Sequence, residues 1–211
     1  MEVQIVFYSM YGHIYQMAEA VARGVREVEG ANVTLYQVEE LVPDAALERT
    51  GAKKAREVFA HVPLADPKKL PEADAVIFGT PTRFGNMCAQ MKNFLDHLGS
   101  LWAVDALVGK VGGVFTSSNT QHGGQESTIL SFHFVLWHLG FILVGLPYAE
   151  KLQTGLEEIK GGSPYGASTI AGSDGSRQPS EVEKAMAAYQ GRHVARITKA
   201  LLAGGWQAGP M

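Results

Sequence analysis

VQIVFYSMYGHI, residues 3–14, is the stretch that decides the fold. Its first half, Val3 to Tyr8, is rich in β-branched and aromatic residues and predicts a buried strand. A glycine-containing turn follows at residues 9–13, and apolar residues then recur at helical spacing from Ile14 to Val25. Residues 32–38 alternate apolar and polar side chains and predict a second strand. The chain therefore opens strand–helix–strand, the unit from which parallel sheets are built.

The same alternation continues along the chain. The expected elements are strands at 73–79, 111–116 and 141–144, and helices at about 87–98, 125–139 and 181–201. Ser180 and Glu183 have the spacing of a capping box and mark the start of the last helix. Residues 39–72 are expected to form a surface connection with one short helix near 53–59. Residues 145–178 are glycine-rich and are interpreted as a long loop.

These elements predict a doubly wound α/β fold. Its five-stranded parallel sheet is covered by helices on both faces, in one domain spanning residues 1–203. Residues 204–211 are interpreted as a C-terminal tail, in which Trp206 is expected to be frayed or packed on a neighbouring molecule.

The composition excludes several classes of protein. Its 18 Lys and Arg against 21 Asp and Glu give a net charge of −3, so the basic surface of a nucleic-acid-binding protein is missing. The single cysteine, Cys88, excludes an internal disulfide and a thiolate zinc site; we expect it to be buried and inert in a reducing, cytoplasmic setting. The N-terminus shows no secretory pattern. The longest apolar stretch, 134–149, is shorter than the ~20 residues of a membrane span.

Polar, glycine-containing loops follow three predicted strands, at 9–14, 80–86 and 117–124. In an open parallel sheet, ligands bind beyond the carboxyl ends of the strands, where the strand order reverses. The first loop leads into a helix N-terminus, whose free N–H groups and dipole favour a phosphate. Gly12 permits close approach and Ser9 adds a hydroxyl. The loop matches neither the dinucleotide-binding nor the P-loop glycine pattern, and by itself it is equally compatible with a plain turn.

The second and third loops carry groups suited to a flat heterocycle. Pro81 stiffens the second loop, and Arg83 would favour a reduced, anionic ring. The third loop offers many hydrogen-bond donors. Taken singly, ordinary roles are the simpler interpretation: a solvated charge for Arg83, a core position for Phe84 and a surface turn at 117–124.

Four longer motifs, Ser9–Ile14, Gly79–Met87, Gly162–Gly172 and Asp174–Ser180, occur in this order. Together they resemble the WrbA family of flavodoxin-like, FMN-dependent NAD(P)H:quinone oxidoreductases. The resemblance extends from Val3 to about Leu202. It implies the flavodoxin strand order 2-1-3-4-5 and a homotetramer in which residues 145–178 contribute to the site or to an interface.

The resemblance also implies a place for each part of FMN and for both substrates. The phosphate would be held by Ser9, Met10, Tyr11, Gly12, His13 and Ile14. The ring would be bordered by Pro81, Thr82, Arg83, Phe84, Gly85 and Asn86, and contacted with the ribityl chain by Ser117, Ser118, Asn119, Thr120, Gln121 and His122. Tyr11 would also lie where the nicotinamide dinucleotide docks, Trp102 over the substrate side of the ring, and His138 at the flavin from a neighbouring subunit or loop. The chain departs from the family pattern in its third loop, which is one residue longer, and at Leu139, where a second histidine is common.

We hypothesise that NADH or NADPH delivers hydride to the flavin and that a quinone then takes two electrons at the same face, beside Trp102. His138 is the candidate proton donor to the reduced quinone, and a core histidine at a helix end is an equally good interpretation. One alternative is a non-enzymatic electron carrier of the same fold, which the modest charge and Trp102 disfavour. Another is a flavin-sensing regulator that binds a transcription factor or DNA, for which no basic helix is present. No metal site is expected.

Overall fold

The computed structural model describes residues 1–210. The strands are β1 (Glu2–Phe7), β2 (Asn32–Gln37), β3 (Ala75–Arg83), β4 (Asn86–Met87), β5 (Val111–Ser118), β6 (Ile142–Leu143) and β7 (Ser168–Ile170). The α-helices are α1 (His13–Arg26), α2 (Asp44–Arg49), α3 (Ala52–Arg56), α4 (Ala89–Asp96), α5 (Gly99–Trp102), α6 (Gln125–His138) and α7 (Glu181–Ala203). Short 3-10 helices lie at η1 (Glu57–Phe59), η2 (Pro67–Glu72) and η3 (Lys151–Thr154).

The central sheet has the order β2-β1-β3-β5-β6, and neighbouring strands in this path run parallel. These five strands are the five predicted from the sequence, so the doubly wound, flavodoxin-like fold is confirmed. The predicted count of five strands was too low, because β4 pairs with β3 and β7 pairs with β5, which makes a seven-stranded sheet. The order reverses between β1 and β3, which places the switch point beside the loop that follows β1.

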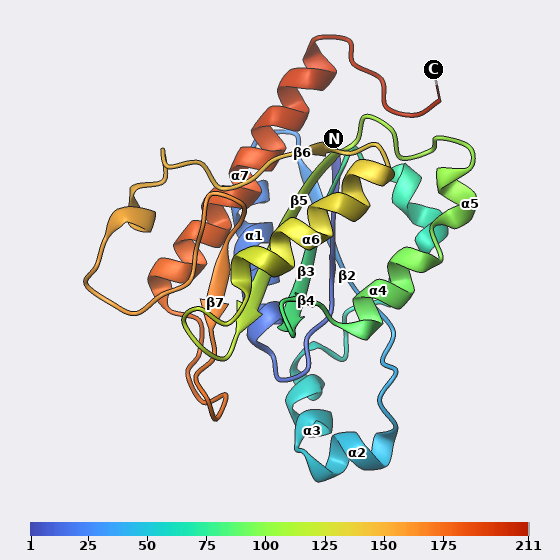
Figure 1. Ribbon diagram of the computed structural model, residues 1–211. Coiled ribbons are helices and arrows are strands. Elements are labelled where there is room, and N and C mark those ends of the chain that lie inside the picture. Colours follow the sequence, from blue (N-terminus) through green and yellow to red (C-terminus); the bar gives the residue numbers. More distant parts are fainter. Residues whose placement is uncertain (211) are drawn as a thin grey trace.

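The edge of the sheet next to β5 is shared by two short strands. β6 pairs with the beginning of β5, Val111 opposite Ile142, and β7 pairs with its end, Thr116 opposite Ser168. The chain between them leaves the sheet and returns (Figure 1). The prediction that residues 145–178 form only a loop was therefore wrong for β7 and η3, which are too short to produce a periodic signal.

Two other predicted loops contain more regular structure than expected. Residues 80–86 were predicted as a loop, but β3 continues to Arg83 and turns back into β4 as a hairpin. The two residues of the turn, Phe84 and Gly85, have φ of 55° and 78°, as a tight hairpin turn requires. In the 39–72 connection, the expected helix near 53–59 is present as α3 and η1, and α2 and η2 were missed.

Helices cover both faces of the sheet (Figure 1). On β1, Ile5 and Phe7 face a core formed with α1 and α7, whereas Val6, and Tyr8 directly after the strand, face a second core formed with α4 and α6. This alternation follows from the two-residue period of a strand. Because both faces are buried, the strands appear in sequence as continuous apolar runs.

Helices α1 and α7 pack closely at two glycines. A Cβ at Gly24 would lie 1.8 Å from the carbonyl oxygen of Ala188, and one at Gly191 would lie 2.1 Å from that of Val21. Neither position has room for a larger residue. This contact fixes the direction of α1, whose N-terminus faces the carboxyl end of the sheet.

The C-terminal tail folds back onto its own chain. The indole Nε1 of Trp206 donates to the Gly109 carbonyl at 2.9 Å, and the Gly209 N–H donates to the Val108 carbonyl at 2.8 Å. The expectation that Trp206 is frayed was therefore wrong. Among residues 1–210, no helix combines the length and the apolar character needed to cross a bilayer.

Candidate functional site

The three predicted loops meet at the carboxyl end of the sheet. They surround a cavity of about 250 Å³ whose lining is Ser9, Met10, Tyr11, His13, Ile14, Pro81, Arg83, Ser117 and Asn119. All nine residues were predicted from the sequence. A neighbouring cavity of about 370 Å³ shares Tyr11, His13 and Asn119 with the first and is closed by Thr50, Ala171, Ser173, Asp174 and Gly175. Two adjacent cavities, each with polar and apolar surface in similar amounts, therefore lie at the carboxyl end.

The loop after β1 presents unpaired backbone donors. The Ser9 hydroxyl oxygen accepts from the N–H groups of Gly12, at 3.1 Å, and Tyr15, at 3.3 Å. Gly12 has φ of 94°, a conformation that suits glycine, and turns the chain into α1. Within residues 1–210, the backbone N–H groups of Met10, Tyr11, His13 and Ile14 have no hydrogen-bond partner. Such an arrangement at a helix N-terminus binds anions, phosphate above all.

His13 joins this loop to the segment on the far side of the cavity. The side chain is buried, and its Nε2 lies 3.1 Å from the Arg177 carbonyl oxygen, so Nε2 carries the proton. Burial lowers the pKa of His13, which keeps the ring neutral near pH 7. His13 therefore acts as a neutral donor that fixes the position of residues 171–177.

That segment is itself held by the buried carboxylate of Glu183, which is 0% exposed. The carboxylate accepts from the Arg177 guanidinium at 2.9 Å and from the Thr169 hydroxyl at 2.7 Å. It also accepts from the backbone N–H groups of Gly161, Ile170 and Ser180, the last of these completing the predicted capping box. One side chain thus ties the glycine-rich segment to the start of α7.

The hairpin after β3 forms the second rim of the cavity. Arg83 donates to the Thr82 carbonyl at 3.0 Å and contacts the Met10 sulfur at 3.6 Å, so it spans the first two loops. The Thr82 hydroxyl accepts from Thr128 of α6 at 2.7 Å. Phe84 is fully exposed, which excludes the alternative of a core residue. Gly85 and Asn86 continue the turn but do not line the cavity.

The third loop contributes less than predicted. Ser117 and Ser118 are buried and belong to β5, not to the loop. The Ser118 hydroxyl donates to the Thr120 carbonyl at 2.7 Å and accepts from the Gln125 amide at 2.8 Å, so it shapes the turn. Thr120, Gln121 and His122 are exposed and line neither cavity. Their contact with a flavin stays a prediction.

Trp102 and His138 lie away from the cavity of their own chain. His138 is the last residue of α6, a helix that starts at the carboxyl end and runs back along the sheet for ~20 Å. Figure 1 shows α5, which ends at Trp102, at the same far end of the molecule. Both side chains are exposed. Neither reaches the carboxyl-end cavity within one chain, so their predicted roles require a neighbouring copy.

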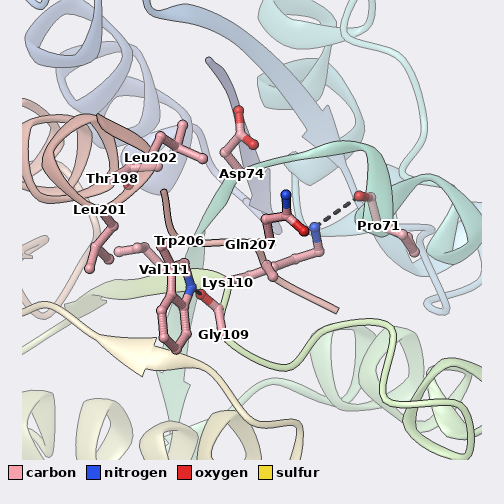
Figure 2. A pocket seen from close by; sticks show the side chains of 11 residues that line it. Pro71, Asp74, Gly109, Lys110, Val111, Thr198, Leu201, Leu202, Trp206 and Gln207 are labelled. Atoms are coloured by element: carbon pink, nitrogen blue, oxygen red, sulfur yellow. Dashed lines mark hydrogen bonds between the residues drawn. The ribbon is translucent and has the colours of Figure 1, made fainter. Parts of the chain in front are cut away.

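A cavity of about 380 Å³ lies at the opposite, amino end of the sheet (Figure 2). The ammonium of Lys110, a buried residue, donates there to the carbonyls of Pro71 at 2.8 Å and Ala73 at 2.6 Å. Trp206 closes the cavity, and its indole N–H donates to the Gly109 carbonyl. Burial lowers the pKa of Lys110. The polar groups of this cavity are thus largely satisfied by the protein, unlike those at the carboxyl end.

Several residues that shape the site carry no recognisable signal in the sequence. Thr50 and Arg56 belong to the 39–72 connection, which has no periodic pattern and no recognised motif. Asp174 lies within a motif of the family resemblance, but nothing in its local sequence connects it to the loop after β1. Cys88, as predicted, is buried, and its burial raises the pKa of the thiol.

The parallel order of the sheet, the unpaired N–H groups after β1 and the hairpin rim after β3 define a flavodoxin-like flavoprotein. A family model described as NADPH-dependent FMN reductase matches residues 9–150. The chain is 68% identical over 204 residues to the NAD(P)H dehydrogenase (quinone) of Aromatoleum aromaticum, covering 97% of this chain and 99% of the relative. It is 66% identical over 202 residues to the protein of the same name from Methanosarcina acetivorans, covering 94% of this chain and 97% of the relative.

Comparison with solved structures supports the flavodoxin-like fold. The flavodoxin-type, WrbA-like protein of Agrobacterium tumefaciens superposes with a TM-score of 0.66 at 25% identity, covering 94% of this chain and 98% of that one. A flavodoxin from the domain Archaea has a TM-score of 0.60 at 17% identity, which shows the shared fold. The chain belongs to the WrbA family within the FMN reductases.

Proposed function

We propose that this protein is an FMN-dependent NAD(P)H dehydrogenase that reduces quinones to hydroquinones. The observation that carries the proposal is the set of unpaired backbone N–H groups at residues 10–14, beside the cavity at the switch point. Relatives 60–68% identical over nearly their whole length bear the name NAD(P)H dehydrogenase (quinone). The overall reaction is NAD(P)H plus quinone plus a proton, giving NAD(P)⁺ and hydroquinone.

The residues present fit FMN. The donors after β1 suit a phosphate dianion. Gly12 leaves open space where a side chain would otherwise stand, since a Cβ at this position would meet no atom within 4 Å. The β3–β4 hairpin and the end of β5 would border the ring and ribityl chain. When bound, the flavin would supply a two-electron store between the nicotinamide and the quinone.

The chain's own part is to bind and orient. Arg83 places a positive charge at the cavity rim, where it favours a reduced, anionic ring. Tyr11 is half exposed at the junction of both cavities, a position suited to a nicotinamide dinucleotide entering from solvent. Neither NADH nor NADPH is favoured by a ribose-reading residue in this arrangement.

Assembly of several copies would complete the site. Large apolar side chains stay exposed at Trp102, Phe134, Trp137, Tyr148 and Leu156, on α5, α6 and the segment before β7. Exposed apolar groups of this kind mark protein interfaces. In the homotetramer implied by the resemblance, Trp102 and His138 of one copy would reach the flavin cavity of another. Trp102 would then cover the quinone, and His138 would donate the proton.

The proposal is tested by mixing FMN-loaded protein with NADH, and separately NADPH, under argon while flavin absorbance is recorded. Rapid bleaching without a long-wavelength band, followed by rapid recovery on addition of benzoquinone, is the expected result. No bleaching by either nucleotide would reject the enzyme in favour of an electron carrier or a flavin-sensing regulator.

The proposed tetramer is tested separately, by sedimentation at micromolar concentration. We expect the protein to act in the cytoplasm.

A further inference from the structure

A buried polar cluster lies directly behind the loop after β1. It brings together Tyr8 directly after β1, Glu40 after β2, Arg56 at the end of α3 and Gln90 on α4. The side chains of Arg56 and Glu40 are only 16% and 15% exposed. Burying a charged pair is costly, so such a cluster needs a reason beyond stability.

Arg56 connects this cluster to the loop itself. Its guanidinium donates to the Ser9 carbonyl at 2.8 Å, to the Gln37 amide oxygen at 3.2 Å, and pairs with Glu40 at 3.1 Å. It also lies over the rings of Tyr8, at 5.5 Å, and Phe59, at 5.3 Å. These contacts on several sides fix the guanidinium in one position.

Glu40 is equally well held. One oxygen accepts from Tyr8 at 2.8 Å, and the other from Gln90 at 2.7 Å and from the N–H groups of Leu41 and Val42. Burial acts to raise the pKa of Glu40, but the hydrogen bonds from Val42, Gln90 and Tyr8 and the charge of Arg56 together lower it. The carboxylate is therefore a fixed anion that holds Arg56 in place.

The Arg56–Glu40 pair can affect the candidate site through Ser9. The Ser9 hydroxyl organises the N–H groups of Gly12 and Tyr15, and Arg56 holds the carbonyl of the same residue. The polar partners of Arg56 in the described chain are Ser9, Gln37 and Glu40, none of which belongs to the hairpin after β3 or to the end of β5. Arg56 can thus influence the phosphate end of the cavity without bonding to the ring end.

We propose that Arg56, held by Glu40, is a positioning residue that fixes the Ser9 carbonyl and so aims the donors after β1 at the flavin phosphate. This rests on the proposed FMN site and deepens it: the pair determines the preference for FMN over riboflavin, which has the same ring and no phosphate. Arg56 is a positioning residue and not a catalytic one, because it lines neither carboxyl-end cavity and its polar contacts are with the chain.

The test compares the affinities of apo-protein for FMN and for riboflavin by quenching of flavin fluorescence. The double variant Arg56→Met with Glu40→Gln removes both charges together, so no lone charge is left buried. We expect FMN to bind about tenfold more weakly while riboflavin changes less than about twofold. Lys54→Gln, which removes one positive charge from the same helix at an exposed position, should leave both affinities unchanged.

Arg56→Lys provides a second variant that keeps the charge next to Glu40 and loses the forked geometry. It should weaken FMN several-fold and spare riboflavin, and circular dichroism establishes that each variant is folded. Equal loss of both flavins, or no loss of FMN, would overturn the positioning role. Wild-type protein that binds neither flavin would instead reject the FMN site itself, so the two failures are distinguishable.

Discussion

The two ends of β5 each border a cavity. The polar groups at the amino end have hydrogen-bond partners within the protein, whereas several at the carboxyl end do not. At the amino end, the Lys110 ammonium donates to two backbone carbonyls and the Trp206 indole to a third. At the carboxyl end, backbone N–H groups after β1 have no partner within residues 1–210. The amino-end cavity, at about 380 Å³, is no smaller than the carboxyl-end cavities of about 250 and 370 Å³. Cavity size therefore does not identify the site, whereas unpaired donors do.

At the carboxyl end, a substitution should lower the free energy of unfolding most at a group whose hydrogen-bond partners lie within the protein. Glu183→Gln should lower the free energy of unfolding by about 3–5 kcal/mol, since it breaks a buried ion pair and places an amide against N–H donors. Urea denaturation of the apo-protein measures this. Glu181→Gln, two residues earlier and exposed, should cost less than about 0.5 kcal/mol. Similar losses in both variants would show that the segment before α7 does not depend on this carboxylate.

The open donors should matter for the ligand rather than for the fold. Ser9→Ala removes the acceptor that orients the Gly12 and Tyr15 N–H groups, so the dissociation constant of FMN should rise about 10- to 100-fold. Fluorescence titration of apo-protein checks it. Ser131→Ala, on α6, removes a hydroxyl bonded only within its helix and serves as the control. An unchanged FMN affinity in Ser9→Ala would place the phosphate elsewhere.

At the amino end, a substitution should lower stability and leave the FMN affinity almost unchanged. Lys110→Met leaves the Pro71 and Ala73 carbonyls without their donor and should lower stability by about 1–3 kcal/mol. The dissociation constant of FMN for folded protein should stay within about twofold of wild type, because the two cavities lie at opposite ends of a strand ~25 Å long. Exposed Lys92→Met is the matched control for stability. A large loss of FMN affinity in Lys110→Met would mean that the two ends are coupled.

The same contrast explains what the sequence could predict. The strands follow from apolar runs such as 75–79, and the anion-binding loop follows from a glycine placed before a helix, whereas the strand order was predicted from the family resemblance. The first two features depend on residues that are close together in the chain, so they can be predicted from the sequence. The nine predicted residues that line the cavity lie in the loop after β1 or at and just beyond the carboxyl ends of β3 and β5.

Long-range contacts were not visible in this way. Nothing near Arg56 in sequence indicates that its guanidinium reaches the Ser9 carbonyl, and β7 is only three residues long. Trp102 and His138 were predicted from resemblance, and a single chain cannot place them at its own cavity, because helix direction carries both to the far end. Whether they reach the cavity of another copy depends on assembly, a property of several chains.

His133, on α6 between the two ends, gives the smallest effect and one that depends on pH. The side chain is buried, its Nε2 has no partner within residues 1–210, and burial lowers its pKa below the usual 6.5. Below pH 6.5 the unfolded chain takes up a proton that the folded chain excludes, so this residue makes stability fall as the pH falls toward the folded pKa. His133→Leu should remove up to about 1 kcal/mol of the loss measured by urea denaturation between about pH 7.5 and 5.5. The FMN affinity at the upper pH should not change. An unaltered pH slope would mean that His133 takes up its proton over the same pH range in the folded and the unfolded chain.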